Sequence, residues 1–306
     1  MTRPRLSNDL ELMAVVFFWA FNVTVVKIAL REMAPLAFNV LRFAGASLLL
    51  LLLTRWLEGS ISVARRDLAR FVMLGVIGHT LYQLFFIMGL ARTTASSTSL
   101  IFGSTPIVVG LLSRLAGHEK VGPGQAAGAA LGFCGVFLIV QAGGQREALV
   151  DAEPLTRLTG NLLVMGAVLC WSLYTVLSKR LLESYSPLRV TAVTLSMGAV
   201  MMIPPAIPDL VGQKWGSVSL TTWAGLSYSL IFALVVSYVL WYRSVKQVGN
   251  VRTAIYSNLV PVFGTLSGVL LLGERLTAGL GLGGACILAG IALARFRDER
   301  AVSSTP

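Results

Sequence analysis

The sequence predicts an all-α integral membrane protein whose ten transmembrane helices form two inverted five-helix repeats, with the N and C termini in the cytoplasm. Only 13% of its 306 residues are charged and 55% are hydrophobic, whereas a soluble protein carries about 25% charged residues. Apolar stretches of about 20 residues, the length that crosses a bilayer as a helix, recur along the whole chain. The two halves also share residue patterns at matched spacing, which indicates an internal duplication.

Two patterns define the duplication. Residues 19–36 and 171–188 read WAFNVTVVKIALREMAPL and WSLYTVLSKRLLESYSPL, and both carry Trp, Lys and Pro at intervals of eight residues. Farther along, the spacing P-x12-E-x8-G-x6-G begins at Pro106 and again at Pro261. The offsets of 152 and 155 residues differ by only three residues. The chain therefore divides into a first repeat (1–141), an inter-repeat loop (142–158) and a second repeat (159–306) that ends in a short basic tail.

The ten predicted spans follow one another with short breaks. Each is long enough to cross about 30 Å of hydrocarbon as a helix. Breaks containing proline separate several of them, at Ala34-Pro35, Gly122-Pro123-Gly124, Ser186-Pro187 and Pro204-Pro205. In chain order the spans are 10–30, 36–55, 69–90, 95–115, 123–141, 159–180, 188–207, 221–243, 251–272 and 277–296.

The number of spans per half fixes the topology. Because five is odd, the second half enters the membrane from the side opposite to the first, which gives an inverted repeat. With the N terminus inside, 17 of the 25 Lys and Arg residues lie on the cytoplasmic side, as the positive-inside rule requires. This bias explains the net charge of +11 without a nucleic-acid partner. We expect a multi-pass protein of the cell inner membrane whose partners are the lipid bilayer and a small-molecule substrate.

Ten spans in two halves, each with the Pro, Glu and Gly spacing and the Trp, Lys and Pro spacing given above, resemble the EamA-type branch of the drug/metabolite transporter (DMT) superfamily. The resemblance covers nearly the whole chain and extends to exporters of aromatic and neutral amino acids. It implies a protein that moves small organic solutes, usually outward, through a central cavity between the two halves.

Spans 3 and 8 carry the most informative polar and aromatic residues. In span 3 the spacing i, i+3, i+4, i+7 places four such side chains on one helical face, and span 8 repeats part of the pattern. Mid-span polar groups usually face a bundle interior or a cavity, so we expect this face to line the substrate path. Aromatic stripes also serve ordinary packing or the interfacial belt. The residues are His79, Tyr82, Gln83 and Phe86 in span 3, and Ser237, Tyr238 and Trp241 in span 8.

Spans 1 and 6 carry a second duplicated face. Trp19 and Asn22 are three residues apart, and Trp171 and Tyr174 repeat that spacing in the second half. An aromatic ring beside a polar group suits a solute with an apolar body and polar ends. The alternative is that the two tryptophans pack the repeats against each other. We weigh the two roles equally, because sequence does not orient a helix within a bundle.

Spans 4 and 9 begin with hydroxyl-rich and amide-bearing turns before a proline. Thr98 precedes Pro106, and Asn258 precedes Pro261. A proline inside a membrane helix leaves a carbonyl that nearby hydroxyls or water can satisfy, so these prolines are candidate hinges. The alternative is that the small polar residues only allow close helix packing.

Three basic residues within spans 1, 2 and 6 have alternative roles. Arg42 lies about 10 Å into span 2 by helical rise and is a candidate partner for a substrate carboxylate. We favour snorkelling, or pairing with Glu32 or a lipid phosphate, as the role of Arg42. Lys27 and Lys179 close spans 1 and 6 in the two halves, where a cation complements the helix dipole. We assign both lysines a mainly structural role, with gating as the alternative.

Spans 5 and 10 are rich in glycine, which permits close helix contact. The sequence does not choose between a contact within one chain and a homodimer through these spans. The three cysteines lie far apart in apolar runs, and no metal site or cofactor is expected. The glycines are Gly124, Gly128, Gly132 and Gly135 in span 5, and Gly279, Gly283, Gly284 and Gly290 in span 10.

These features predict a secondary transporter that works by alternating access, and the resemblance implies export of small amphipathic metabolites, aromatic and neutral amino acids foremost. The sequence holds no Walker A motif for ATP. It holds no mid-span acid for a carboxylate proton relay either. The alternative carrier is an efflux protein for drugs and hydrophobic cations that stack on aromatic faces, although such a site ordinarily needs a buried acid. An enzyme is not expected, because no coherent catalytic constellation is present.

Overall fold

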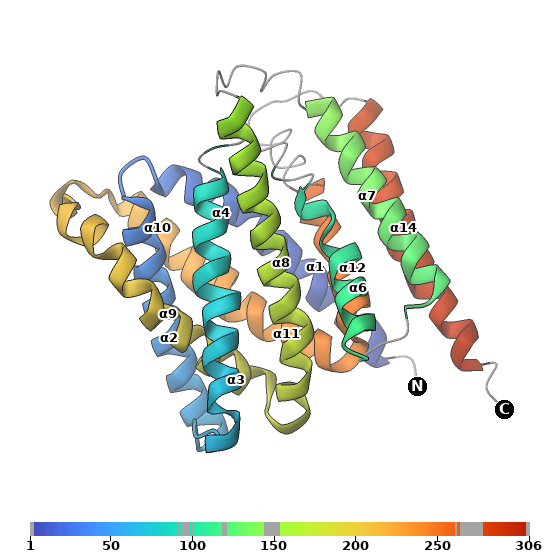
Figure 1. The fold of residues 1–306 in the computed structure, drawn as a ribbon, viewed down its shortest axis with the longest axis horizontal. Helices are drawn as coiled ribbons and strands as arrows, with labels where there is room; N and C mark the ends of the chain where they lie inside the picture. Colours follow the sequence, from blue (N-terminus) through green and yellow to red (C-terminus); the bar gives the residue numbers. More distant parts are fainter. Residues whose placement is uncertain are drawn as a thin grey trace. The chain divides into compact units, whose positions relative to one another are not determined.

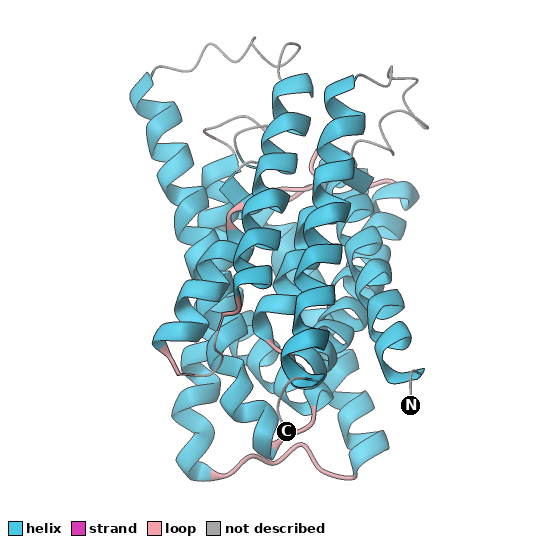
Figure 2. Ribbon diagram, turned by 90° about the vertical axis from the view of Figure 1, so that its right-hand side faces the viewer, coloured by secondary structure: helices cyan, strands magenta, loops and turns pink. Residues whose placement is uncertain are grey.

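The computed structural model describes residues 3–90, 92, 98, 101–117, 121–143, 154–260, 262–263 and 278–303. Within these residues the protein is helical and contains no strand (Figure 2), which confirms the all-α prediction. Among the described residues, five helices are long and apolar enough to cross a membrane, and three shorter apolar helices accompany them. The count of ten crossings and the cytoplasmic termini stay predictions, because parts of spans 4 and 9 lie outside the described residues.

The helices labelled in Figure 1 follow the predicted spans closely. The third and eighth spans are each continuous helices with a π-helical segment in the middle. In chain order the elements are α1 (Arg3–Ala29), α2 (Pro35–Glu58), α3 (Arg65–Gly75), η1 (Val76–Leu81), α4 (Tyr82–Leu90), α6 (Thr105–Leu115), α7 (Pro123–Gly143), α8 (Pro154–Ser184), α9 (Pro187–Gly212), η2 (Trp215–Ser217), α10 (Leu220–Tyr228), η3 (Ser229–Val236), α11 (Ser237–Val248), α12 (Asn250–Ile255), η4 (Tyr256–Asn258) and α14 (Ala278–Ser303).

Three of the four predicted proline breaks are helix starts. α2, α7 and α9 each begin at a proline, whose fixed φ and missing N–H suit the first helical turn. The fourth prediction, a break at Pro204-Pro205, is wrong because α9 continues to Gly212 with three prolines inside it. A membrane helix tolerates proline, since neighbouring groups and local backbone adjustment satisfy the freed carbonyls. Helix α8 begins at Pro154, within the stretch 142–158 that the sequence assigns to the inter-repeat loop.

The chain forms two compact units that each combine segments from both halves of the sequence. Unit 1 contains Met1–Gln83 and Leu177–Lys246, and unit 2 contains Leu84–Val176 and Gln247–Pro306. The helix of span 3 and helix α8 each pass from one unit to the other. The compact units therefore do not coincide with the sequence repeats 1–141 and 159–306. The repeats describe the duplication of the sequence and not the compact units of the structure.

In unit 1, two chain connections meet at one end of the helices, called here the first end. The turn between α1 and α2 binds the segment between α9 and α10: Ala34 N–H donates to Gln213 Oε1 over 2.8 Å. The exposed Glu32 carboxylate accepts from the Ser219 N–H and the Thr222 hydroxyl, both at 2.8 Å. The Ser219 backbone hydrogen bond, with help from Thr222, lowers the pKa of Glu32 below its ordinary value. These hydrogen bonds hold the turn between α1 and α2 against the segment between α9 and α10 at the first end.

Two other connections of unit 1 meet at the second end. The turn between α8 and α9 binds the end of α2, where Arg189 Nη2 lies 3.0 Å from Glu58 Oε2. The Tyr185 hydroxyl donates to Asp67 Oδ2 over 2.9 Å and accepts from Ala64 N–H over 3.0 Å. Successive connections therefore alternate between the two ends, so α2 and α9, which are spans 2 and 7, run in opposite directions.

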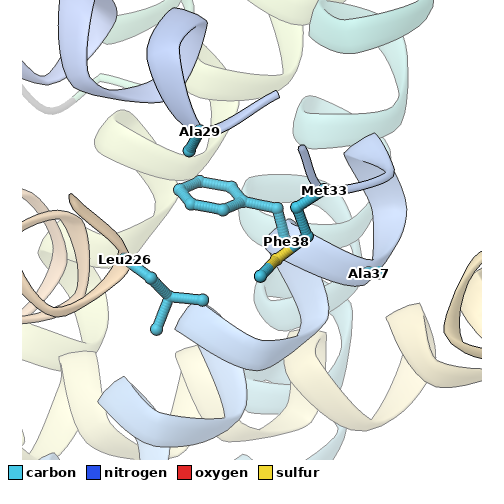
Figure 3. Packing of buried hydrophobic residues seen from close by; sticks show 5 residues of the cluster. All are labelled: Ala29, Met33, Ala37, Phe38 and Leu226. Carbon is cyan, nitrogen blue, oxygen red and sulfur yellow. The ribbon is translucent and has the colours of Figure 1, made fainter. Parts of the chain in front are cut away.

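Apolar packing near the first end holds α1, α2 and α10 together. Figure 3 shows Phe38 of α2 among Ala29, Met33, Ala37 and Leu226. Phe38 is fully buried. Lipid tails are as apolar as these side chains, so the cluster stabilises the fold through van der Waals contact rather than through escape from water.

Glycines allow the closest helix contacts in both units. In unit 1, a Cβ added to Gly198 of α9 would lie 2.4 Å from His79 Cβ and 2.7 Å from the Gly75 carbonyl oxygen. In unit 2, a Cβ on Gly135 would lie 2.5 Å from the Gly283 carbonyl oxygen, where α7 and α14 run side by side (Figure 1). The glycine-rich faces of spans 5 and 10 thus contact each other within the chain. A homodimer through these spans remains a prediction.

Candidate functional site

The candidate site of unit 1 is built around two π-helical segments at matching places in the two halves. η1 interrupts the helix of span 3 and η3 interrupts that of span 8. The 155-residue offset maps 76–81 onto 231–236, so the segments are equivalent by repeat. Just after η3, the hydroxyl of Ser237, the first residue of α11, donates to the carbonyl of Phe232, five residues earlier, over 2.7 Å. Single-turn π segments inside α-helices are rare and are frequent at functional sites.

The π segment alters the predicted face of span 3. His79 lies inside η1, whereas Tyr82 and Gln83 begin the regular helix α4. The wider π turn rotates the side chains that follow it relative to an α-helical pattern. The regular i, i+3, i+4, i+7 spacing that predicts one shared face therefore does not hold here, and which of these residues meet has to be read from their contacts.

His79 is fully buried between helices of unit 1. Its ring stacks on Tyr238 of α11 with centroids 5.6 Å apart, and it meets Phe43 edge to face at 5.9 Å. Nε2 lies 3.3 Å from the Thr194 hydroxyl, which itself lies 2.8 Å from the Val190 carbonyl oxygen. Because the hydroxyl donates its single hydrogen to that carbonyl, it accepts from His79 Nε2–H. This assigns the tautomer that carries its proton on Nε2.

Trp19 extends the aromatic cluster across to α1. Its indole N–H donates to the Ala233 carbonyl of η3 over 3.0 Å. Its ring lies 5.0 Å from that of Trp241 and 6.1 Å, edge to face, from that of Tyr238. We name Trp19, His79, Tyr238 and Trp241 the aromatic cluster. It unites predicted residues from spans 1, 3 and 8, whereas the sequence assigns Trp19 to a separate face of spans 1 and 6.

Arg42 of α2 provides the charge beside this cluster. Its side chain is only 5% exposed. Nη1 donates to the Ser229 hydroxyl over 3.1 Å and Nη2 donates to Gln83 Oε1 over 3.2 Å. The pairing with Glu32 that the sequence favours is wrong, because Glu32 is held by Ser219 and Thr222. Snorkelling to the membrane surface is also wrong, since the guanidinium turns inward to Gln83 and Ser229.

Other predicted site residues belong to unit 2. Trp171 and Tyr174 of α8 are buried and meet edge to face at 6.0 Å. Phe86 packs edge to face on Phe102 at 5.7 Å. Thr98 is buried. The buried amide of Asn258 has no hydrogen-bond partner within the described residues and lies against Gly132.

The predicted hinge and gating residues are only partly described. Pro106 is buried in the first turn of α6, and Pro261 lies outside the described residues. Lys27 belongs to α1, but its side chain is outside the described part. Lys179 is half-buried and lies five residues before the end of α8, so it does not close that helix as predicted. Asn22 of α1 is half-buried, and its Oδ1 makes no hydrogen bond in the described part.

Sequence reasoning misses three contributors to the site. Ser229 binds Arg42, Thr194 binds His79, and Phe43 lies against both Arg42 and His79. Ser229 and Thr194 could have been identified from the sequence as polar residues in the middle of a span. Phe43 has no such signal in the sequence. Among the described residues, no group of three or more His, Cys, Asp or Glu side chains is placed to hold a metal ion.

Comparison with known proteins identifies relatives over nearly the whole chain. The EamA-like transporter family matches residues 7–141 and 158–296. An uncharacterized transporter of Archaeoglobus fulgidus is 28% identical over 96% of this chain and 99% of its own. The probable amino-acid metabolite efflux pump of Salmonella typhimurium is 26% identical over 90% of this chain and 91% of its own.

One solved structure has the same fold. A crystal structure of a protein that is 18% identical aligns with a TM-score of 0.77, covering 96% of this chain and 98% of that chain. At this identity the likeness concerns the fold alone.

Proposed function

Because the chain belongs to the EamA-like transporter family of the DMT superfamily, we propose that it is a secondary exporter of small amphipathic metabolites, aromatic and neutral amino acids foremost. We place it in the cell inner membrane. The observation that carries this proposal is the aromatic cluster of unit 1, which lies beside buried hydrogen-bonding groups in an otherwise apolar bundle. Intramembrane polar groups of this kind mark solute pathways.

The chemistry of the cluster suits a solute with a ring and polar ends. Trp19, Tyr238 and Trp241 offer ring faces and edges, on which an aromatic or aliphatic side chain packs well. Gln83 and Arg42 provide polar groups within the same unit. The Salmonella relative, described as a probable amino-acid metabolite efflux pump, supports the same class of solute.

Alternating access is the proposed mechanism. The two sequence halves are inverted repeats by prediction, and such repeats exchange conformations around a central site without ATP. Two features support the proposal: the equivalent π segments η1 and η3, and the alternating connections of unit 1. π segments satisfy their backbone hydrogen bonds less regularly than α-helices, which makes them natural points for a helix to adjust.

Counterflow in proteoliposomes tests the proposal. Purified protein is reconstituted into vesicles loaded with unlabelled phenylalanine, and uptake of labelled phenylalanine, leucine or the hydrophobic cation tetraphenylphosphonium is measured. We expect saturable counterflow of the amino acids without sodium or ATP, and none in protein-free vesicles. Counterflow of the cation alone, measured in vesicles loaded with it, would instead establish the efflux alternative, which the buried positive charge of Arg42 opposes.

A further inference from the structure

Arg42 is a permanent positive charge inside the apolar part of unit 1. A guanidinium stays protonated in proteins. Its side chain is 5% exposed, and it lies seven residues, about 10 Å, beyond the start of α2. A buried charge is costly unless it is paired and fully hydrogen-bonded. The hydrogen-bond and charge partners of Arg42 therefore indicate which kind of ligand it can bind.

The protein supplies only part of what this guanidinium requires. Of its five N–H donors, two bind neutral acceptors, Ser229 Oγ at 3.1 Å and Gln83 Oε1 at 3.2 Å. Hydrogen bonds from a guanidinium to a carboxylate are shorter, about 2.7–2.9 Å. Nε is buried and has no acceptor within the described residues. The rings of Phe38 and Phe43 lie 5.5 and 5.4 Å from the guanidinium carbon and stabilise the cation without neutralising it.

No carboxylate of the described residues forms an ion pair with Arg42. Five acids of unit 1 have described hydrogen-bond or ion-pair partners, and none of these partners is Arg42. Their recorded partners are Arg243 for Glu11, Ser219 and Thr222 for Glu32, Arg189 for Glu58, Arg70 and Tyr185 for Asp67, and Leu36 N–H for Asp209. Because no carboxylate of the described residues neutralises Arg42, a bound anion fits this position.

The neighbours of Arg42 indicate a carboxylate on a ring-bearing solute. The ring of Phe43 lies 5.4 Å from the Arg42 guanidinium carbon and meets His79 edge to face, and His79 stacks on Tyr238. An anion held by Arg42 would therefore lie near the aromatic cluster. A planar carboxylate fits the planar guanidinium fork. A lipid phosphate is less suited, because Arg42 is enclosed by protein about one third of the way along its helix.

We propose that Arg42 binds the carboxylate of the transported solute, so that the substrates are ring-bearing monocarboxylates for which an amino group is dispensable. The proposal rests on the transport function proposed above. The carboxylate is required because it neutralises Arg42. The ammonium of an amino acid is dispensable for two reasons. None of the four residues of the aromatic cluster is an acid that could bind it, and the nearby guanidinium repels it.

Binding measured by tryptophan fluorescence tests the proposal without relying on transport, since Trp19 and Trp241 lie in the cluster. The purified protein is titrated with phenylalanine, with 3-phenylpropionate, which lacks the amino group, and with phenethylamine, which lacks the carboxylate. We expect the first two to bind with affinities within a few-fold of each other and phenethylamine to bind at least about tenfold more weakly, the difference of one charge-assisted hydrogen bond.

Two variants make the test specific. Arg42→Gln should weaken binding of 3-phenylpropionate by roughly 10- to 100-fold, with Arg42→Lys between Arg42→Gln and the unchanged protein. The same variant should not weaken binding of phenethylamine and should strengthen it where the guanidinium repels the ammonium. Arg31→Gln, which removes an exposed charge at the first end, should bind like the unchanged protein. An equal loss for all three compounds would show a structural role for Arg42 and overturn the proposal. Failure of the unchanged protein to bind 3-phenylpropionate would overturn it as well.

A lipid arm and a transport arm separate the remaining explanations. If Arg42→Gln alters the response to phosphatidylglycerol micelles but not to 3-phenylpropionate, the anion is a lipid phosphate and the proposal fails. If 3-phenylpropionate binds through Arg42 but amino acids show no counterflow, the carboxylate site stands and amino-acid export fails. If amino acids show counterflow that Arg42→Gln does not change, export stands and the carboxylate site fails.

Discussion

Gly198→Ala tests the close contact that positions His79. The added Cβ would lie 2.4 Å from His79 Cβ, 2.7 Å from the Gly75 carbonyl oxygen and 3.3 Å from His79 Cγ. Ordinary contacts of this kind are about 3.5–4.0 Å. Two of the three obstacles are backbone or Cβ atoms, which no rotamer change can move. Helix α9 therefore has to separate from α3 and η1 by about 1 Å.

Two losses set the magnitude. Overpacking of a well-packed interior costs about 1–3 kcal/mol. The separation also lengthens the hydrogen bond that Thr80 Oγ1 donates to the Gly198 carbonyl, now 3.0 Å, beyond hydrogen-bond distance, which costs about 0.5–1.5 kcal/mol. We expect a total destabilisation of about 2–4 kcal/mol, together with weaker solute binding because the His79 ring shifts against Tyr238.

Gly212→Ala is the matched control, because it lies on the same helix and its added Cβ meets nothing within 4 Å. Both variants are compared with the unchanged protein by thermal unfolding in one detergent and by counterflow. Gly198→Ala should unfold several degrees lower with a raised apparent Km, while Gly212→Ala should match the unchanged protein. Equal unfolding temperatures for the two variants would refute the inferred contact between α9 and η1.

Three further changes test other parts of the fold and site. Trp241→Ala should raise the apparent Km for phenylalanine about tenfold by removing about 1 kcal/mol or more of ring contact, whereas Trp56→Ala, with a side chain that is 80% exposed, should not change it in the same counterflow assay. Gly290→Ala should destabilise unit 2 by about 1–3 kcal/mol, because its Cβ would lie 2.6 Å from the Gly128 carbonyl oxygen, and unchanged unfolding would contradict the packing of α7 on α14. The lowered pKa of Glu32 gives stability that is present above the unfolded pKa of about 4.5 and is lost as pH falls through the folded pKa. Thermal unfolding of Glu32→Gln should therefore differ from that of the unchanged protein at pH 7, and the two should converge in acid.

Much of the fold is predictable from sequence because membrane helices obey simple rules. Apolar length locates the helices, and prolines at 35, 123 and 187 mark three helix starts correctly. The repeat register correctly relates spans 3 and 8, and it groups Tyr238 and Trp241 with His79. Proline pairs mislead at 204–205, since a membrane helix can keep proline inside it.

The environment of Arg42 could not be predicted, because it depends on tertiary contacts. An arginine 10 Å into a span can turn outward to the membrane surface or inward to the bundle, and its sequence neighbours are the same in both cases. The choice is made by Gln83, 41 residues away, and by Ser229, 187 residues away. The composition of the compact units is unpredictable for the same reason, since segments from both sequence halves pack into each unit.

The paired π segments connect the duplication to the site. A π turn holds one residue more than an α turn, so its presence at equivalent positions in spans 3 and 8 is simplest to explain if the ancestral five-helix unit already contained it. The two copies now hold different chemistry: η1 carries His79, and η3 carries Ser229, which binds Arg42. Arg42 itself has Thr194 as its repeat partner, and Thr194 binds His79. The duplication therefore supplies equivalent π segments, whereas Arg42, the proposed carboxylate-binding residue, is present in one half only.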